Sequence, residues 1–495
     1  MSISDNYTKY LEISHKPLEN LDPNLKSWSK KYDRMHKKIK LKPIISGGNS
    51  LIDRVSILLF LTYGITNWHA SCRANAPFIR QFKRPIPSGG ALYPNEIYVL
   101  INMDSVTIDR GIYHYDPYSH ELTLIKTGVK IKKVIDSVFK LNSVSEKDFL
   151  LFTTCLLDKN SYRYTDWSYR IQNIDTGVLL HRIYDITNYL ENDILFYLNF
   201  NDEQLSEILG LDESEGVLGV CKISDKNLNE SETIPRALSS NEKLNKLNNH
   251  NLPQTFSKNY NTIIDFHNST KIEEDIELPS KKSNENSLET ITSIKLPKPK
   301  PIKGIEVDKY LYTRYTTFNF FQKEAINIER FSNVLYRSFK DIEKFKGIPN
   351  LLRIYIIVRN VTGLSPGLYS YNPNSHVLDL HEEKDLTQDI KKYIVHPTLD
   401  VNKIGATFIL TGNYNTSCKV HNRTYRYLNI SAGVQLGFLV TSSIHSDLGR
   451  YPMLSYDVKG IKELLNLDRY TYPLTMFLSG VQTTNLMKIK YPMFI

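Results

Sequence analysis

The sequence has little cysteine and no long apolar run. Its four cysteines lie far apart and show no paired spacing, which argues against a zinc site, an iron–sulfur cluster or a disulfide framework. No apolar segment reaches the roughly 20 residues needed to cross a bilayer. The first residues also lack the basic-then-apolar pattern of a signal sequence. We therefore expect a cytoplasmic protein with no metal and no membrane partner.

The basic residues are scattered along the chain and form no stripe. The formal net charge is +9 over 495 residues. A nucleic-acid-binding protein would gather its lysines and arginines together, with aromatic residues between them, so we expect no nucleic-acid partner. A basic surface also suits an acidic peptide. The apolar fraction of 41% and the charged fraction of 23% are typical of a globular protein, and the length suits two domains.

An internal repeat organises the chain. Residues 111–122 reappear as residues 367–378, so that His120 and His376 are 256 positions apart (376 minus 120). Four blocks that share one offset are not a chance event, and they indicate two copies of one fold. The other blocks are Tyr169-Arg170 with Tyr425-Arg426, Gly177 with Gly433, and residues 209–212 with residues 465–468.

Each copy shows the same expected order of elements. A strand is followed by a tyrosine-rich hairpin, a further strand and a long helix that opens at a Tyr-Arg pair. Strands and helices mix without regular alternation, which favours an α+β fold. Because the two histidines repeat with the whole hairpin motif, we expect them to be structural. The ranges are helix 51–64, strands 96–102 and 149–156, and, in the second copy, strands 353–358 and 405–410.

A polar segment separates the copies. Residues 225–301 are rich in Asn, Ser, Lys and Glu and end in alternating prolines, which favour an extended backbone. We predict a first domain at residues 1–224, a linker at residues 225–301 and a second domain at residues 302–495. Within the linker, residues 264–267 are a candidate for a short docked piece.

One segment of the first copy suits an anionic ligand. It reads Pro87-Ser88-Gly89-Gly90. Two adjacent glycines allow the backbone to approach a ligand closely, and the serine adds a hydroxyl. Flanking prolines stiffen the segment. Such a sequence is also common in ordinary turns.

The loop, the following Tyr93-Pro94, the Gly-aliphatic-Tyr-x-Tyr-Asp-Pro hairpin and the Tyr-Arg helix start together resemble the signature of SagB-type dehydrogenases. These are nitroreductase-like flavin enzymes that act in the maturation of ribosomally made peptides. The resemblance covers nearly the whole chain and includes a tandem arrangement. It implies two nitroreductase-like copies that form an intramolecular pseudo-dimer and bind FMN. It also implies a precursor peptide, and a cyclodehydratase or other maturation enzyme, as partners.

The resemblance assigns FMN contacts to both copies. Besides the glycine loop, the family has an early Arg-x-Ser-x-Arg/Lys motif, which matches Arg330 and Ser332 of the second copy. There Val334 replaces the last basic residue. The basic pair that holds phosphate in the family resembles Lys488 and Lys490.

The reciprocal site is expected to be lost. The second copy has residues 344–349 in place of the glycine loop, and the first copy shows no clear Arg-x-Ser before its first apolar helix. We therefore expect one FMN per chain.

A pair of residues near the Tyr-Arg helix start is the catalytic candidate. Azoline-oxidising members of the family carry Lys-Tyr there, and the matching residues are Arg163 and Tyr164. A base must take a proton from ring carbon while hydride leaves to the flavin. Arginine stays protonated, so Tyr164 is the candidate base, with Arg163 lowering its pKa. The alternative is an ordinary turn between strand and helix.

The resemblance leaves three functions open. The first is FMN-dependent dehydrogenation of thiazoline or oxazoline rings to azoles. The second is NAD(P)H- and FMN-dependent reduction of dehydroalanine in a lanthipeptide pathway, which needs an acid rather than a base. The third is a non-catalytic partner that holds the peptide in a synthetase complex.

Overall fold

The computed structural model contains two compact units. The N-terminal unit ends at Ile276, and the C-terminal unit begins at Glu277. The short segment Phe345–Ile348 packs in the N-terminal unit. The structure describes residues 37–42, 50–73, 76–104, 108–224, 243–244, 260–279, 288–299, 316–317, 321–340, 342, 345–396, 399–415 and 422–483.

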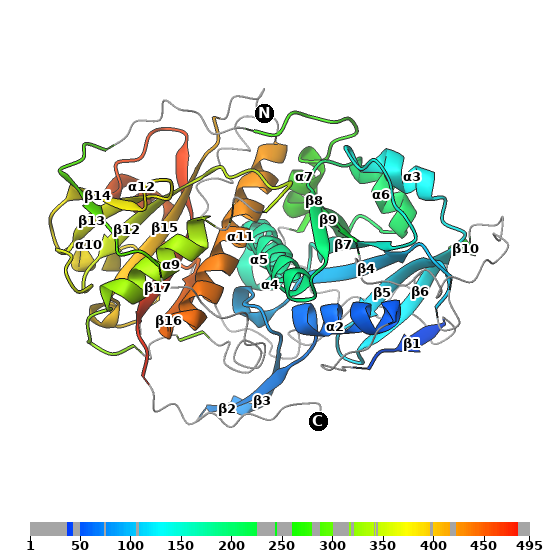
Figure 1. The fold of residues 1–495 in the computed structure, drawn as a ribbon, viewed down its shortest axis with the longest axis horizontal. Coiled ribbons are helices and arrows are strands. Elements are labelled where there is room, and N and C mark those ends of the chain that lie inside the picture. Colours follow the sequence, from blue (N-terminus) through cyan, green and yellow to red (C-terminus); the bar gives the residue numbers. More distant parts are fainter. Residues whose placement is uncertain are drawn as a thin grey trace. The chain divides into compact units, whose positions relative to one another are not determined.

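The N-terminal unit is built on an 8-stranded antiparallel sheet (Figure 1). Its strand order is β1-β6-β5-β4-β7-β9-β8, with β10 paired to β6. The central strands β4 and β7 are buried along their whole length, which explains their near-continuous apolar sequences. The strands are β1 (Lys38–Lys40), β4 (Asn95–Ile101), β5 (Gly111–Asp116), β6 (Glu121–Thr127), β7 (Asp148–Leu156), β8 (Asp193–Tyr197), β9 (Glu215–Ser224) and β10 (Lys243–Leu244).

A long buried helix, α5 (Ser168–Tyr189), packs against α2 (Leu51–Tyr63) and the sheet. Helix α2 begins where the Ser50 hydroxyl accepts a hydrogen bond from the N–H of Asp53. The two-stranded hairpin of β2 and β3 extends from this unit (Figure 1). The remaining elements are β2 (Asn67–Arg73), β3 (Ala76–Lys83), α3 (Ile131–Ser137), α4 (Ser161–Tyr164), α6 (Asp202–Leu209), α7 (Tyr260–Ser269) and the 3₁₀ turns η2 (Gly89–Ala91) and η3 (Thr165–Trp167).

The C-terminal unit has a 7-stranded antiparallel sheet in the order β11-β14-β13-β12-β15-β17-β16. Its strands are β11 (Thr292–Lys295), β12 (Leu352–Val358), β13 (Gly367–Asn372), β14 (Val377–Glu382), β15 (Ala406–Asn413), β16 (Leu448–Met453) and β17 (Thr471–Val481). Its helices are α9 (Ile328–Lys340), α10 (Thr387–Lys391), α11 (Arg423–His445) and α12 (Val458–Leu464), with the 3₁₀ turn η6 (Val401–Lys403).

The two units repeat one topology. Strand for strand, β1-β6-β5-β4-β7-β9-β8 corresponds to β11-β14-β13-β12-β15-β17-β16. The predicted hairpins are β5–β6 and β13–β14, and the predicted long helices are α5 and α11. The tandem duplication of an α+β fold is therefore confirmed.

In each copy, a serine on the first long helix contacts the histidine of the tyrosine-rich hairpin. In the N-terminal unit, the Ser56 hydroxyl donates to the carbonyl of Lys42 (2.6 Å) and lies 3.1 Å from Nε2 of His120. The other ring nitrogen of His120 lies 3.0 Å from the Tyr115 hydroxyl, and its carbonyl accepts from the N–H of Leu41. Because both ring nitrogens and the carbonyl of His120 are used in this way, its role is structural.

The same atoms meet in the C-terminal unit. The Ser332 hydroxyl donates to the carbonyl of Pro297 (2.6 Å) and lies 2.8 Å from Nε2 of His376. Nδ1 of His376 lies 2.8 Å from the Tyr371 hydroxyl, and its carbonyl accepts from the N–H of Leu296. Strand β11 and Pro297 thus belong to the second fold copy, although they lie within residues 225–301.

Helix α7 docks another part of that polar segment onto the N-terminal unit. It contains residues 264–267. His267 is buried, and its Nδ1 lies 3.1 Å from the hydroxyl of Tyr169. A Cβ placed on Gly216 would lie 2.1 Å from the His267 ring. The bare glycine therefore makes room for this helix.

The counterpart of the glycine loop in the second copy has become an aromatic anchor. Phe345 is buried in the N-terminal unit, stacked on Phe196 at 4.1 Å and tilted against Tyr184 at 5.0 Å. The carbonyl of Lys346 accepts from the N–H of Phe196. Gly347 has a φ of +99°, and a Cβ there would lie 1.9 Å from the carbonyl oxygen of Phe196. Backbone therefore packs directly on backbone at this point.

Candidate functional site

The predicted glycine loop forms a tight turn between β3 and β4. Gly89 and Gly90 lie in η2, and Gly90 has a φ of +62°. Ala91 and Tyr93 also have positive φ values of +56° and +50°. Such a run of left-handed residues is uncommon outside glycine. The surrounding contacts must therefore hold the loop in this shape.

Asp175, on α5, makes most of those contacts. The Ser88 hydroxyl donates to Oδ2 of Asp175 at 2.6 Å, and the N–H of Gly89 donates to Oδ1 at 3.1 Å. The Ser88 oxygen in turn accepts from the N–H of Tyr93 at 2.9 Å. Asp175 is not among the residues predicted from the sequence. In the sequence, the one sign of its role is that a carboxylate stands on the apolar face of a long helix.

The structure brings the catalytic candidates to this loop. Arg163 and Tyr164 end the short helix α4. A Cβ built on Gly90 would lie 2.6 Å from the Tyr164 hydroxyl oxygen and 3.1 Å from Nε of Arg163. The Arg163 guanidinium carbon is 5.5 Å from the centre of the Tyr164 ring. A glycine is therefore required where the loop meets this pair.

Burial raises the pKa of Tyr164 above its usual value. The Arg163 charge and hydrogen bond act in the opposite direction, and the nearby Asp175 carboxylate adds to the rise. Arg163 thus acts in the expected direction, but the loss of solvent outweighs the neighbouring cation, and the pKa of Tyr164 stays raised. At neutral pH Tyr164 carries its proton.

Burial also raises the pKa of Asp175, to about 7, against the lowering effect of the bonds from Ser88 and Gly89. An aspartate whose folded pKa lies above its unfolded value stabilises the fold most at low pH, and this contribution is lost as pH rises toward 7. We predict that the N-terminal unit loses about 2 kcal/mol of unfolding free energy between about pH 5.5 and pH 8 through this group. Urea unfolding at both pH values measures it, and the loss should shrink in Asp175→Asn. An equal loss in both proteins would contradict the assignment.

A buried arginine supports the loop from behind. Arg84 lies between two aromatic rings, with its guanidinium carbon 4.0 Å from the centre of Tyr63 and 4.8 Å from that of Tyr93. The ammonium of Lys159 donates to the carbonyl of Tyr93 at 3.0 Å. Burial lowers the pKa of Lys159 to about 8. Tyr93 is thus fixed on its ring face and at its backbone, which in turn positions Ser88.

No protein-family model matches the chain. A crystal structure of a candidate nitroreductase from Anabaena variabilis matches 98% of the chain and 100% of that protein, with a TM-score of 0.76 and 21% identity. The chain has the nitroreductase fold. At this identity the likeness speaks for the fold alone.

Two curated relatives share shorter segments with this nitroreductase-like chain. The candidate nitroreductase MJ1384 from Methanocaldococcus jannaschii is 26% identical over 159 residues, which cover 29% of the chain and 77% of the relative. The trifolitoxin-processing protein TfxB from Rhizobium leguminosarum bv. trifolii is 32% identical over 76 residues. That match covers 15% of the chain and 20% of TfxB, so the chain spans only a small part of this relative.

The second nitroreductase-like copy places its predicted residues differently. Arg330 is exposed on α9. Ser332, two positions on, is buried and bonded to Pro297 and His376 as described above. Lys488 and Lys490 lie outside the described residues. The assignment of these residues to a flavin site stays a prediction.

The first copy has an Arg-x-Ser after all. Arg54-Val55-Ser56 lies on α2, and Ser56 occupies the same contact in its copy as Ser332 does in the second. No such motif precedes the first apolar helix, as expected, but this one lies within the helix.

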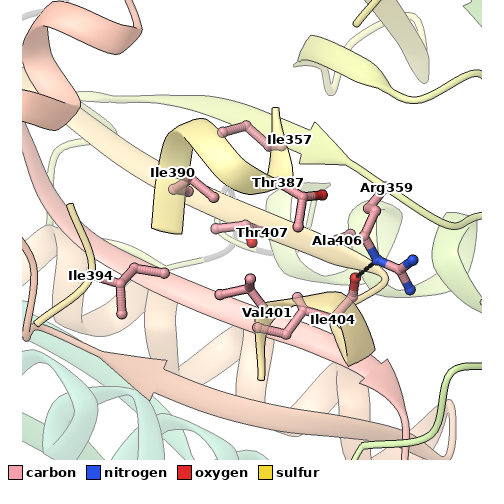
Figure 2. Close-up of a pocket in the computed structure, with 9 residues that line it drawn as sticks. All are labelled: Ile357, Arg359, Thr387, Ile390, Ile394, Val401, Ile404, Ala406 and Thr407. Carbon is pink, nitrogen blue, oxygen red and sulfur yellow. Dashed lines mark hydrogen bonds between the residues drawn. The ribbon is translucent and has the colours of Figure 1, made fainter. Parts of the chain in front are cut away.

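A small pocket lies in the C-terminal unit, away from the predicted site residues. Arg359 stands at one edge, where its Nε donates to the carbonyl of Ile404 at 2.7 Å (Figure 2). The pocket is mostly aliphatic, so it is best described as part of the core. The lining residues are Ile357, Arg359, Thr387, Ile390, Ile394, Val401, Ile404, Ala406 and Thr407.

Metal and membrane features are absent from the part of the chain that the structure describes. There, no cluster of histidine, cysteine and carboxylate side chains could hold a metal ion. None of the helices described is long and apolar enough to cross a membrane. Cys155 and Cys221 are buried free thiols.

Proposed function

We propose that this chain is an FMN-dependent oxidoreductase of ribosomal peptide maturation that dehydrogenates azoline rings. The observation that supports this most is the meeting of Tyr164 and Arg163 with Gly90 of the glycine loop. Two sequence motifs about seventy residues apart, each assigned to the flavin chemistry by resemblance, thus lie together. The match to a trifolitoxin-processing protein is consistent with a peptide as substrate, with a precursor peptide and a cyclodehydratase as partners.

The residues of the loop fit a flavin. Nε of Arg163 is buried and has no hydrogen-bond partner, and it lies beside Gly90, where a side chain is absent. Buried donors are usually paired in folded proteins, so this nitrogen is available to donate to a ligand beside Gly90. Bound FMN would supply the hydride acceptor. Gly90 and Arg163 would contact it, while Ser88 and Gly89 act from behind through Asp175.

Tyr164 would handle the proton. Because its pKa is raised, it starts as a neutral hydroxyl and must give up its own proton before it can serve as a base. Arg163 stabilises the resulting phenolate. Dehydrogenation should therefore accelerate as the pH rises.

The protonated Tyr164 also favours the second candidate function. A neutral hydroxyl beside the loop is the acid that reduction of dehydroalanine requires, with NAD(P)H as the source of hydride. In that direction the rate should fall as the pH rises.

Mass spectrometry of a peptide product tests both directions. The purified chain, loaded with FMN, is expected to keep the yellow cofactor through gel filtration. It should then remove two hydrogen atoms from an azoline-containing peptide in the presence of oxygen. A gain of two hydrogen atoms on a dehydrated peptide with NAD(P)H would replace the first function by the second. Loss of all flavin on gel filtration would contradict the proposal, and retained peptide affinity would then favour the non-catalytic partner.

A further inference from the structure

A single carboxylate connects the long helix α5 to the glycine loop. Asp175 accepts hydrogen bonds from both the Ser88 hydroxyl and the Gly89 N–H. One helical turn earlier, Ile171 touches the same loop, since a Cβ on Gly89 would lie 2.4 Å from Cγ2 of Ile171. Residues four apart share one face of a helix. One face of α5 thus holds the loop by contact and by charge.

The connection continues to the catalytic candidate. Gly90 follows directly after the residues that Asp175 holds, and it lies against the Tyr164 hydroxyl. A shift of the loop relative to α5 would change the distance between Gly90 and the Tyr164 hydroxyl. The distance between loop and hydroxyl therefore depends on Asp175.

From this geometry we propose that Asp175 is a positioning residue of the redox site, which sets the glycine loop against Tyr164. The inference rests on the proposed function for its catalytic part. Its structural part, that Asp175 fixes the loop, stands without any cofactor.

The other copy shows that this helix position generally holds the segment before the central strand. Ser431 of α11 is 256 residues after Asp175, the offset of the repeat. Its hydroxyl donates to the carbonyl of Pro349 at 3.1 Å, just before β12. In the second copy a neutral donor thus holds a carbonyl, whereas in the first copy a carboxylate holds an N–H and a hydroxyl.

Burying the Asp175 carboxylate costs free energy that a neutral side chain in the same place would not cost. Asp175 is 4% exposed, and none of the ion pairs between described residues includes it. A buried charge without a cation is unfavourable. The titratable groups that its charge reaches are Tyr63 on α2, Cys155 on β7 and Tyr164 on α4. Since a serine suffices in the second copy, the charge is better explained by the loop that it holds.

Hydrogen exchange and kinetics together test the proposal. Asp175→Asn keeps the shape of the side chain, and Ser88→Ala removes one of its bonds. Without added flavin and at about pH 8, where Asp175 is ionised, both variants should exchange the amides of residues 84–95 at least about tenfold faster than the parent chain. Asp175→Asn takes the charged acceptor from the Gly89 N–H, and Ser88→Ala removes the acceptor of the Tyr93 N–H together with one bond to Asp175. With saturating FMN, Asp175→Asn should lower kcat at least about tenfold and leave the KM for the peptide within about twofold. Ser431→Ala, the matched control, should change neither quantity.

The outcomes separate the inference from the proposed function. Unchanged exchange in both variants overturns the positioning role, whether or not the chain binds FMN. If the parent chain turns over peptide, and the variants exchange faster but keep the same kcat, then Asp175 only stabilises the fold of the loop. That result also overturns the positioning role. If the parent chain neither binds FMN nor turns over peptide, the proposed function fails, and faster exchange in the variants still supports the tie between Asp175 and the loop.

Discussion

Under the proposed function, Tyr164→Phe should lower turnover at least about a hundredfold and leave the flavin content unchanged. The change removes only the hydroxyl oxygen that lies beside Gly90. The ring remains held by Trp167, whose ring centre is 5.8 Å away, so the loop should keep its shape. General acid–base groups contribute about 10²–10⁴ to rates, and the loss applies whether Tyr164 gives or takes the proton. Steady-state turnover at saturating FMN, with flavin content read from absorbance, measures the effect.

A matched tyrosine distinguishes this role from a general loss of a hydroxyl. Tyr189 is 41% exposed at the end of α5, and Tyr189→Phe should leave turnover unchanged. Arg163→Lys adds a second comparison, since it creates the Lys-Tyr pair of the azoline-oxidising enzymes that the sequence resembles, and it should keep turnover. Full activity in Tyr164→Phe would show that Tyr164 does not transfer the proton and would contradict its proposed role.

Gly347→Ala should destabilise the N-terminal unit by about 3 kcal/mol or more. Two penalties combine at this position. The φ of +99° is one that side chains rarely adopt, and the new methyl would lie 1.9 Å from the carbonyl oxygen of Phe196. That carbonyl is backbone and cannot rotate away, so the segment must leave. Phe345 would then lose its stack on Phe196, and a buried aromatic ring would meet water.

Gly363→Ala is the control for the backbone part of this effect. Gly363 also has a positive φ, +77°, but a Cβ there would meet only Ile328 at 3.9 Å. It should cost about 1 kcal/mol, the ordinary penalty of the left-handed region. Urea unfolding followed by circular dichroism gives both values. Equal costs would show that the segment yields easily and that the close backbone contact carries no energy.

The repeated hairpin and the order of elements could be predicted from sequence. The hairpin sequence around His120 and His376 encodes its own turn, because Asp116 and Asn372 each cap a backbone N–H two residues on. Such local chemistry leaves a readable pattern. The meeting of Tyr164 with Gly90 was expected only through a family resemblance, since nothing in the spacing of the two motifs brings them together.

The remaining features depend on contacts between distant parts of the chain. Asp175 has a role only because α5 lies against a loop that is 86 residues away in sequence. The raised pKa of Tyr164 reflects how much solvent the fold removes, and the neighbouring Arg163 predicts the opposite direction. Strand β11 is too short and polar to stand out from the segment around it. It becomes a strand because β14 offers it a partner edge.

The two serine–histidine contacts also record how the copies have diverged in length. Ser56 and His120 are separated by 64 residues, and Ser332 and His376 by 44. The first copy thus holds twenty additional residues (64 minus 44) in this interval, which contains the hairpin of β2 and β3. Between α9 and β12, the described residues include no such hairpin. The serine and histidine meet in the same way in both copies, although the number of residues between them differs. The duplicated fold could therefore accept an insertion next to the glycine loop without a change in the strand order of its sheet.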